Sequence, residues 1–202
     1  MTLLRRSLLV AATTLPALAH ATANVDAPAP VFTATTADGK TVNLADFKGK
    51  TVVLEWTNHD CPFVRKHYGS GNMQNQQKAA TAQGVVWLQV ISSAPGQQGF
   101  VDGAMAARLN SERGAAPTAT LLDPKGELGK LYGAQTTPHM FVIKADGTLA
   151  YKGGIDSIAT ADKTDIAKAE PYVTEALAAV AAGRKVEKAS TRPYGCSVKY
   201  AS

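Results

Sequence analysis

Beyond its N-terminus, the sequence lacks any apolar run approaching the roughly 18 residues that a membrane-spanning helix needs. Charge is modest: the formal net charge is +5 over 202 residues, and 18% of the residues are charged. Arg5 and Arg6 lie in a segment predicted to be removed, which leaves a charge of +3 on scattered basic residues. Neither a nucleic acid nor an anionic membrane surface is therefore expected as a partner.

The N-terminus has the pattern of a secretory signal peptide. Residues 1–6 form a short basic segment, and residues 7–18 form an apolar segment too short to span a bilayer. Ala21-Thr22-Ala23 then offers an A-x-A cleavage site. The sequence predicts a signal peptide over residues 1–23 and export to the periplasm or the cell exterior. An uncleaved N-terminal anchor is the alternative, and the choice between Sec and twin-arginine export stays open.

Cysteine occurs only twice, at Cys61 and Cys196, and both lie in the mature part of the chain. Export implies an oxidising compartment, where disulfides persist. Cys61 follows an apolar run at residues 51–56 and precedes Pro62, a pattern typical of thiol-redox sites. Such sites usually carry a second cysteine three residues on, but Val64 stands there. The sequence leaves open whether Cys196 is a redox partner of Cys61, a permanent structural link, or bonded to another chain.

The length and the 45% apolar content fit one α/β domain with a substantial core. We expect a mobile leader over residues 24–30, the domain over residues 31–183, and an irregular basic tail over residues 184–202. Apolar strands separated by helices predict a central sheet with helices on both faces. The expected strands are at residues 31–35, 41–44, 51–56, 84–91, 118–122, 139–143 and 148–152. The expected helices are at residues 61–68, 72–82, 100–113, 127–132 and 167–182.

Cys61 is the strongest candidate for chemistry because it lies at the predicted start of a helix. A helix N-terminus stabilises negative charge, and the thiolate is the reactive form of cysteine. Arg65, one turn further on, is expected to lower the pKa of Cys61, with Lys66 and His67 adding positive potential. Asp60 acts in the opposite direction, since an adjacent carboxylate disfavours a thiolate. The alternative is a buried, inert cysteine, which the polar residues just upstream argue against.

A metal site is not expected. His59 and His67 flank the Cys-Pro turn, but their spacing does not place them together with Cys61 on one helical face. They are interpreted as surface or site-tuning residues. Trp56 is expected to pack in the core, and Asp156 is expected to serve only in a turn or cap.

Three segments resemble a known family. Residues 32–56 (FTATTADGKTVNLADFKGKTVVLEW) and residues 121–156 (LLDPKGELGKLYGAQTTPHMFVIKADGTLAYKGGID) resemble the redoxin group, which is related to alkyl hydroperoxide reductase and thiol-specific antioxidant. Residues 191–200 (TRPYGCSVKY) resemble the tail of its peroxiredoxin-like branch. The resemblance implies a thioredoxin-like fold, with a central mixed β-sheet flanked by helices and an N-terminal β-hairpin.

The resemblance also implies roles for individual residues. Cys61 would be the nucleophile and Cys196 the thiol that resolves it. Pro138 matches the cis-proline beside the reactive cysteine of thioredoxin-like proteins, where it would shape a substrate groove together with Thr137. Asn58 would contact the reacting group.

The sequence departs from peroxiredoxins proper at two positions. Those proteins carry a proline seven residues and a threonine or serine three residues before the peroxidatic cysteine, whereas this chain has Leu54 and Asn58. The departures favour disulfide exchange and slow peroxide reduction over dedicated peroxidase activity.

Together these observations predict an exported thiol oxidoreductase that needs no cofactor. Its expected partners are a disulfide or hydroperoxide substrate and an external dithiol reductant. Pairing of cysteines within one chain or across a homodimer stays open. The alternative is a non-catalytic binding or structural module with a permanent Cys61–Cys196 disulfide.

Overall fold

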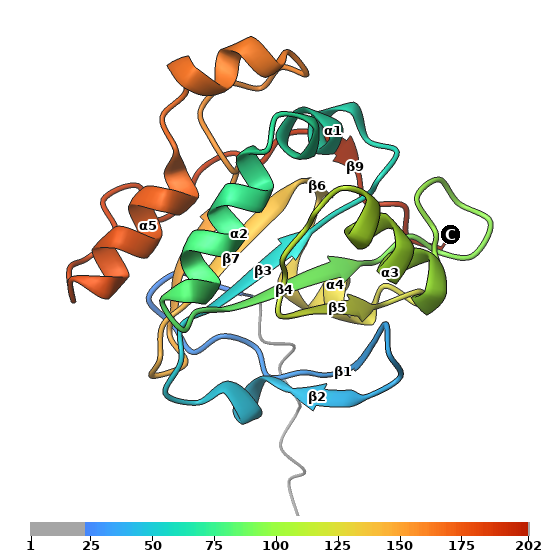
Figure 1. Cartoon of the computed structure of the whole chain (residues 1–202). Helices are drawn as coiled ribbons and strands as arrows, with labels where there is room; N and C mark the ends of the chain where they lie inside the picture. The colour runs from blue at the N-terminus through green and yellow to red at the C-terminus, as the bar shows by residue number, and fades with distance from the viewer. Residues whose placement is uncertain (1–22, 202) are drawn as a thin grey trace, which may run out of the picture.

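The computed structural model describes residues 23–201, so the predicted signal peptide lies outside the described residues except for Ala23. A seven-stranded sheet in the order β2-β1-β5-β4-β3-β7-β8 forms the centre, and β6 pairs with β9 beside it (Figure 1). The strands are β1 (Thr33–Thr36), β2 (Thr41–Asn43), β3 (Val52–Trp56), β4 (Val86–Ile91), β5 (Ala119–Leu122), β6 (Thr136–Thr137), β7 (His139–Ile143), β8 (Leu149–Gly153) and β9 (Cys196–Ser197). The helices are α1 (Pro62–Gly69), α2 (Asn72–Ala82), α3 (Gly103–Glu112), α4 (Glu127–Tyr132) and α5 (Tyr172–Ala181), with 3-10 helices η1 (Leu44–Phe47) and η2 (Lys163–Lys168).

The sheet is mixed, as predicted. Strands β3, β4 and β5 run parallel, whereas β7 is antiparallel to β3, and β1 is antiparallel to β5. Every residue of β3 and β4 is buried, because these central strands are covered on both faces. That double burial is why both strands read as nearly continuous apolar runs in the sequence.

Alternate residues of β3 point to the two faces of the sheet. Val52, Leu54 and Trp56 pack in a cluster that includes α4 residues, while Val53 packs in a second cluster with α1, α2 and α5. Trp56 is fully buried and contacts the rings of Tyr132 and Phe141, which confirms it as a core residue. The site therefore stands on a rigid strand that is packed from both sides.

Two segments differ from the sequence prediction. Residues 24–30 were expected as a mobile leader, but they pair with the β8 end of the sheet through Asp26 N–Leu149 O and Ala29 N–Gly147 O, both 2.9 Å. This pairing satisfies an otherwise open sheet edge. The last helix begins at Tyr172 rather than near residue 167, because Pro171 cannot continue a helix through its own position and η2 forms upstream.

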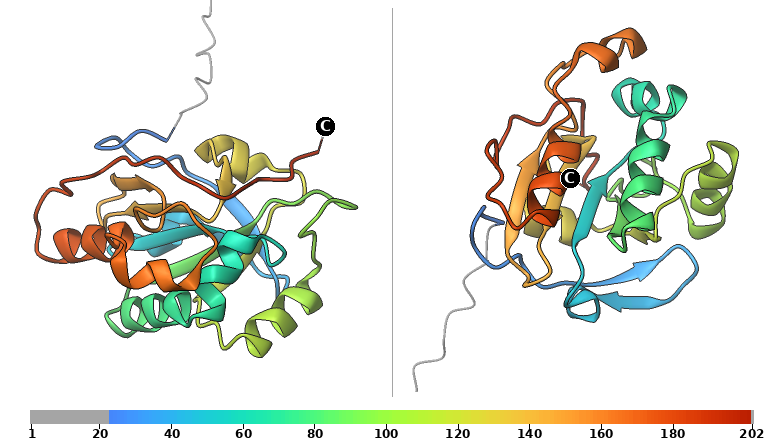
Figure 2. Two further views of the ribbon diagram at one scale, coloured as in Figure 1. Left: turned by 90° about the horizontal axis from the view of Figure 1, so that it is seen from above. Right: turned by 60° about the vertical axis from the view of Figure 1, so that its left-hand side comes forward.

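The C-terminal tail follows a defined path across the carboxyl end of the central strands, whereas the sequence predicted an irregular segment. Figure 2 shows it leaving α5 and crossing toward α4. Among the hydrogen bonds that fasten it along the way are Thr191 N–Lys152 O (3.1 Å), Val198 N–Gln135 O (3.0 Å), Ala94 N–Lys199 O (2.8 Å) and Tyr200 Oη–Ala134 O (2.7 Å). The path brings the second cysteine to the end of β3, where Cys61 lies.

Across residues 23–201, none of the helices combines the length and the apolar character that crossing a membrane requires.

Candidate active site

Cys61 is the N-cap residue of α1, as the sequence predicted. Its backbone is extended (φ −72°, ψ 124°), and its carbonyl oxygen accepts the first helical hydrogen bond from Arg65 N at 2.9 Å. Pro62 occupies the first turn of the helix, where its missing N–H costs nothing. Strand β3 ends at Trp56, and a short turn delivers Cys61 to the carboxyl end of the central strand.

Cys196 lies directly against Cys61. Strand β9 pairs with β6 in the register Thr137↔Cys196, and Cys196 N lies 3.4 Å from the sulfur of Cys61. The same sulfur donates to Thr137 O at 3.0 Å. Both cysteines are free thiols in this structure. The tail thus holds the second cysteine at the site and does not need to travel to reach it.

The tail also covers Cys61, which is fully buried. The alternative of a buried, inert cysteine is therefore correct about the burial of Cys61. The docked tail and the β6 edge contribute to this burial, because Cys196 N and Thr137 O both contact the sulfur. The tail therefore lies directly against the sulfur that a substrate would have to reach.

The two thiols differ in acidity. Burial by itself raises the pKa of Cys61, but hydrogen bonds from the Cys196 thiol and from the backbone N–H groups of Val64 and Cys196 outweigh it and lower the pKa. Burial, the hydrogen bond with Cys61 and the negative charge there raise the pKa of Cys196 to about 11. Cys61 is therefore the thiol that ionises first.

Arg65 does not act on Cys61 as the sequence suggested. Its guanidinium donates to Asp60 Oδ1 at 2.8 Å and to His59 O at 3.0 Å, and it is not among the groups that lower the pKa of Cys61. The ion pair neutralises the one carboxylate that would oppose a thiolate. Any help from Arg65 is therefore indirect.

Lys66 and His67 also depart from their expected role as nearby positive charges. Both side chains are fully buried, and Lys66 Nζ donates to Ile158 O at 3.0 Å, away from Cys61. Burial lowers the pKa of His67 to about 4, so the imidazole is neutral near pH 7. Neither residue supplies a free positive charge at the sulfur.

Asn58 was expected to contact the reacting group, but its side chain is committed elsewhere. Its Nδ2 donates to Gln98 O at 3.2 Å, and its Oδ1 accepts from Asp60 N at 2.9 Å. A Cβ added at Gly99 would lie 2.2 Å from Asn58 Oδ1, so the neighbouring loop is packed tightly onto this amide. Asn58 shapes the turn that presents Cys61.

Thr137 and Pro138 lie where the resemblance placed them. The Thr137–Pro138 peptide bond is cis, as predicted. Thr137 contacts Cys61 through its carbonyl oxygen, which accepts a hydrogen bond from the sulfur at 3.0 Å. Together with Cys61 and Cys196 they form a compact site at the carboxyl end of β3.

Sequence analysis did not anticipate a buried carboxylate behind the site. Glu55 is fully buried on β3 and accepts hydrogen bonds from Tyr68 Oη (2.7 Å), Trp87 Nε1 (2.8 Å) and Gln77 Nε2 (3.0 Å). Burial raises the pKa of Glu55 despite these donors. The sequence does contain a signal, because the apolar run VVLEW includes a glutamate. A buried strand tolerates a carboxylate only where hydrogen-bond donors contact it.

Asp156 was assigned to a turn or cap, and the structure gives it a larger role. It is buried and accepts hydrogen bonds from Tyr194 Oη at 2.5 Å and from Ile158 N at 3.1 Å. This contact ties the tail to the body of the domain close to Cys196. Its sequence signal was weak, because the partner lies 38 residues further along the chain.

No group of three or more histidine, cysteine, aspartate or glutamate side chains within residues 23–201 is arranged to hold a metal ion. His59 and His67, which flank the Cys-Pro turn, contact different residues. His59 Nε2 lies 3.4 Å from Asp60 Oδ2, whereas His67 contacts Tyr194 and Asn72.

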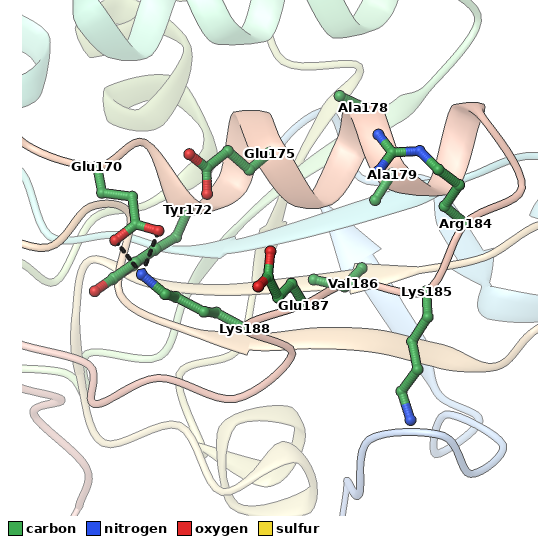
Figure 3. Close-up of a pocket in the computed structure, with 10 residues that line it drawn as sticks. All are labelled: Glu170, Tyr172, Glu175, Ala178, Ala179, Arg184, Lys185, Val186, Glu187 and Lys188. Carbon is green, nitrogen blue, oxygen red and sulfur yellow. Dashed lines mark hydrogen bonds and ion pairs between the residues drawn. The ribbon is translucent and has the colours of Figure 1, made fainter.

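Two hollows on the surface do not include either cysteine. Figure 3 shows one of about 300 Å³ between α5 and the start of the tail, where Lys188 pairs with Glu170 at 2.5 Å. The other, of about 670 Å³, lies beside α1 and is lined in part by Pro62, Arg65 and Arg113. The second hollow borders the start of α1 without including the sulfur of Cys61 in its lining.

Comparison with known proteins defines the class. The fold is thioredoxin-like, and residues 25–152 match the AhpC/TSA family. The chain belongs to the AhpC/TSA family and is a thiol oxidoreductase. No curated protein matches the chain.

Three solved structures illustrate the similarity of fold. An uncharacterized conserved protein of Geobacillus kaustophilus is 24% identical with a TM-score of 0.74, over 89% of this chain and 93% of that one. A hypothetical protein of Sinorhizobium meliloti 1021 is 20% identical with a TM-score of 0.72, over 89% and 96%. A thiol:disulfide interchange protein from a Bacteroides species is 19% identical with a TM-score of 0.51, over 72% and 88%.

Proposed function

We propose that this protein is an exported thiol-disulfide oxidoreductase in which Cys61 is the nucleophile and Cys196 the resolving thiol. The observation that carries the proposal is the pairing of Thr137 with Cys196, which holds Cys196 N 3.4 Å from the sulfur of Cys61. The register of β6 and β9 thus places the second thiol beside the first, as a resolving step requires.

With a disulfide substrate, the Cys61 thiolate attacks one sulfur of R–S–S–R′ and the other sulfur leaves as R′–S⁻. The Cys196 thiolate then attacks the sulfur of Cys61 in the mixed disulfide, and R–S⁻ leaves. The substrate gains two electrons and, after protonation, two protons. The protein is left with a Cys61–Cys196 disulfide, which an external dithiol reduces to restore both thiols.

With a hydroperoxide, the Cys61 thiolate attacks the terminal oxygen, the O–O bond breaks, and the alkoxide leaves and is protonated. Cys61 becomes a sulfenic acid, which the Cys196 thiolate attacks with loss of water. Both routes end in the same disulfide. Disulfide exchange is favoured, because Leu54 and Asn58 replace residues that peroxiredoxins use, and because Asn58 is engaged with Gln98.

The acidity of the two thiols supports this order of events. The charge on Cys61 and its hydrogen bond contribute to the raised pKa of Cys196. Once Cys61 is oxidised, that charge is gone, and the pKa of Cys196 falls toward its ordinary value. The thiolate fraction of Cys196 therefore rises after Cys61 has reacted, which favours the resolving step.

Thr137 and Pro138 are assigned to substrate positioning, because Thr137 O lies 3.0 Å from the sulfur of Cys61 and a cis bond joins the two residues. Arg65 is assigned the supporting task of neutralising Asp60. Export is inferred from residues 1–23 and suits the chemistry, since disulfide exchange is useful in an oxidising compartment.

A redox titration against glutathione tests the proposal. A redox-active Cys61–Cys196 pair should titrate at a potential above about −300 mV, in the range of catalytic disulfides. The non-catalytic alternative predicts a permanent bond that no physiological dithiol opens. Unchanged disulfide-exchange activity in Cys61→Ser would reject the proposed nucleophile.

A further inference from the structure

A buried polar cluster joins helix α1 to the tail, and the chemistry proposed above does not use it. Its members are Lys66 and His67 of α1, Asp156 of the turn after β8, and Tyr194 of the tail. The side chains of Lys66 and His67 are fully buried and that of Asp156 is 5% exposed. Removing one partner of a buried, charged group is costly, so each member of the cluster depends on the others.

The hydrogen bonds in the cluster run in one direction. Asn72 Nδ2 lies 2.8 Å from His67 Nδ1, and because an amide nitrogen only donates, Nδ1 is the acceptor and the proton sits on Nε2. His67 Nε2 then donates to Tyr194 Oη at 3.1 Å, and Tyr194 Oη donates to Asp156 Oδ1 at 2.5 Å. The hydroxyl of Tyr194 is thus satisfied on both sides. Lys66 Nζ lies 3.7 Å from Asp156 Oδ2 and balances the carboxylate.

The ring of Tyr194 is enclosed as well. It meets Phe63 edge to face with centroids 5.8 Å apart, and Lys66 Nζ lies 5.7 Å from its centroid. A Cβ added at Gly154 would lie 3.5 Å from Tyr194 Cδ1, so the turn after β8 also contacts the ring. This ring is held by residues of α1, the helix that begins at Cys61.

Only Gly195 separates Tyr194 from Cys196. Gly195 has φ +131°, and a Cβ there would lie 2.0 Å from Thr137 O, so the backbone passes in close contact with the β6 edge. Two residues span at most about 7 Å, so the position of Tyr194 largely fixes that of Cys196. Anchoring Tyr194 to α1 therefore anchors Cys196 to Cys61.

We propose that Tyr194 is a positioning residue for the resolving thiol: its hydroxyl, held by Asp156 and His67, keeps Cys196 docked against Cys61. The inference rests on the proposed function. In the reduced protein only non-covalent contacts hold the tail, so loss of the hydroxyl lowers the docked population and the effective concentration of Cys196 at Cys61. A hydrogen bond to a charged group is strong enough for a change of about tenfold or more.

The test is Tyr194→Phe in the mature full chain, reacted in its reduced form with oxidised glutathione and followed by intact mass. We expect attack on glutathione to be retained, the Cys61–glutathione mixed disulfide to accumulate, and its conversion to the Cys61–Cys196 disulfide to slow about tenfold. A tenfold loss of effective concentration corresponds to a potential about 30 mV higher for the Cys61–Cys196 couple. Tyr132→Phe is the matched control, since it removes a buried hydroxyl whose partner, Pro30 O at 2.7 Å, is not part of the tail.

Hydrogen exchange separates release of the tail from loss of stability. Tyr194→Phe should speed exchange at Val198 N, which donates to Gln135 O, and leave the amides of β7 unchanged. If Tyr194→Phe converts the mixed disulfide as fast as wild type and Tyr132→Phe, with the same potential of the Cys61–Cys196 couple, the positioning role is overturned. The proposed function would remain intact. Absence of any mixed disulfide or Cys61–Cys196 disulfide in the wild type would instead reject the proposed function.

Discussion

The backbone amide of Cys196 lies 3.4 Å from the sulfur of Cys61, although 135 positions separate the two residues in the chain. The contact is made by a two-residue strand, β9, paired with the edge that precedes Pro138. The tail therefore plays two parts: it carries the second thiol and it contributes to the burial of the first. Both parts lead to measurable consequences.

The first prediction concerns the acidity of Cys61. Cys196→Ala removes a thiol that donates to Cys61, and because this hydrogen bond lowers the pKa of Cys61, the pKa should rise in the variant. The ionised fraction of Cys61, followed by absorbance or by the rate of alkylation as a function of pH, should therefore reach its midpoint at a higher pH than in wild type. A midpoint that stays or moves down would show that the Cys196 thiol does not stabilise the thiolate.

The second prediction concerns access to Cys61. Gly195→Ala places a methyl group against Thr137 O and should displace the tail, so alkylation of Cys61 should speed up about tenfold with little loss of global stability. Gly183→Ala is the matched control, because Gly183 also has a positive φ (+65°) but a Cβ there meets nothing within 4 Å. Equal alkylation rates in both variants would mean that the tail does not limit access.

The third prediction concerns the buried Glu55. Glu55→Leu leaves three buried donors, from Tyr68, Gln77 and Trp87, without their acceptor. The free energy of unfolding should fall by about 3 kcal/mol or more, measured by urea denaturation. Glu112→Leu, at an exposed site paired only with Arg108, should change it by less than about 1 kcal/mol. Similar losses in the two variants would contradict the structural role of Glu55.

The fourth prediction concerns pH. Burial lowers the pKa of His67 and of His139 from 6.5 to about 4. Between these values the unfolded chain binds more protons than the folded one, so stability is full above about pH 6.5 and falls as the pH drops toward 4. Each histidine contributes a few kcal/mol to this fall on an order-of-magnitude basis. His139→Gln should flatten the slope by about one proton, measured by urea denaturation at several pH values. An unchanged slope in His139→Gln would contradict this assignment.

Much of the fold follows from the sequence, because its signals are local. The helices over residues 72–82 and 127–132 were predicted to the residue, since glycines mark their ends. A helix start near Cys61 was predicted as well, and the resemblance predicted the cis bond before Pro138. The central strands β3 and β4 were visible as apolar runs because both of their faces are buried.

The parts that sequence reasoning missed depend on distant contacts. The partner of Asp156 is Tyr194 and the edge that pairs with Cys196 is Thr137, and neither relationship leaves a periodic pattern. Arg65 was assigned to Cys61 from helical spacing alone, but spacing could not show that Asp60 lies closer to its guanidinium. Asn58 was likewise assigned by position, before its bond to Gln98 was visible.

The most direct test of the account is the intact mass of the reduced mature protein after a brief pulse of a small disulfide, compared among wild type, Cys196→Ser and Cys61→Ser. The account predicts loss of about 2 Da in the wild type, a retained mixed-disulfide adduct in Cys196→Ser, and no reaction at the site in Cys61→Ser. An adduct that forms equally well in Cys61→Ser, or a Cys196→Ser protein that retains none, would contradict Cys61 as nucleophile and Cys196 as its resolving partner.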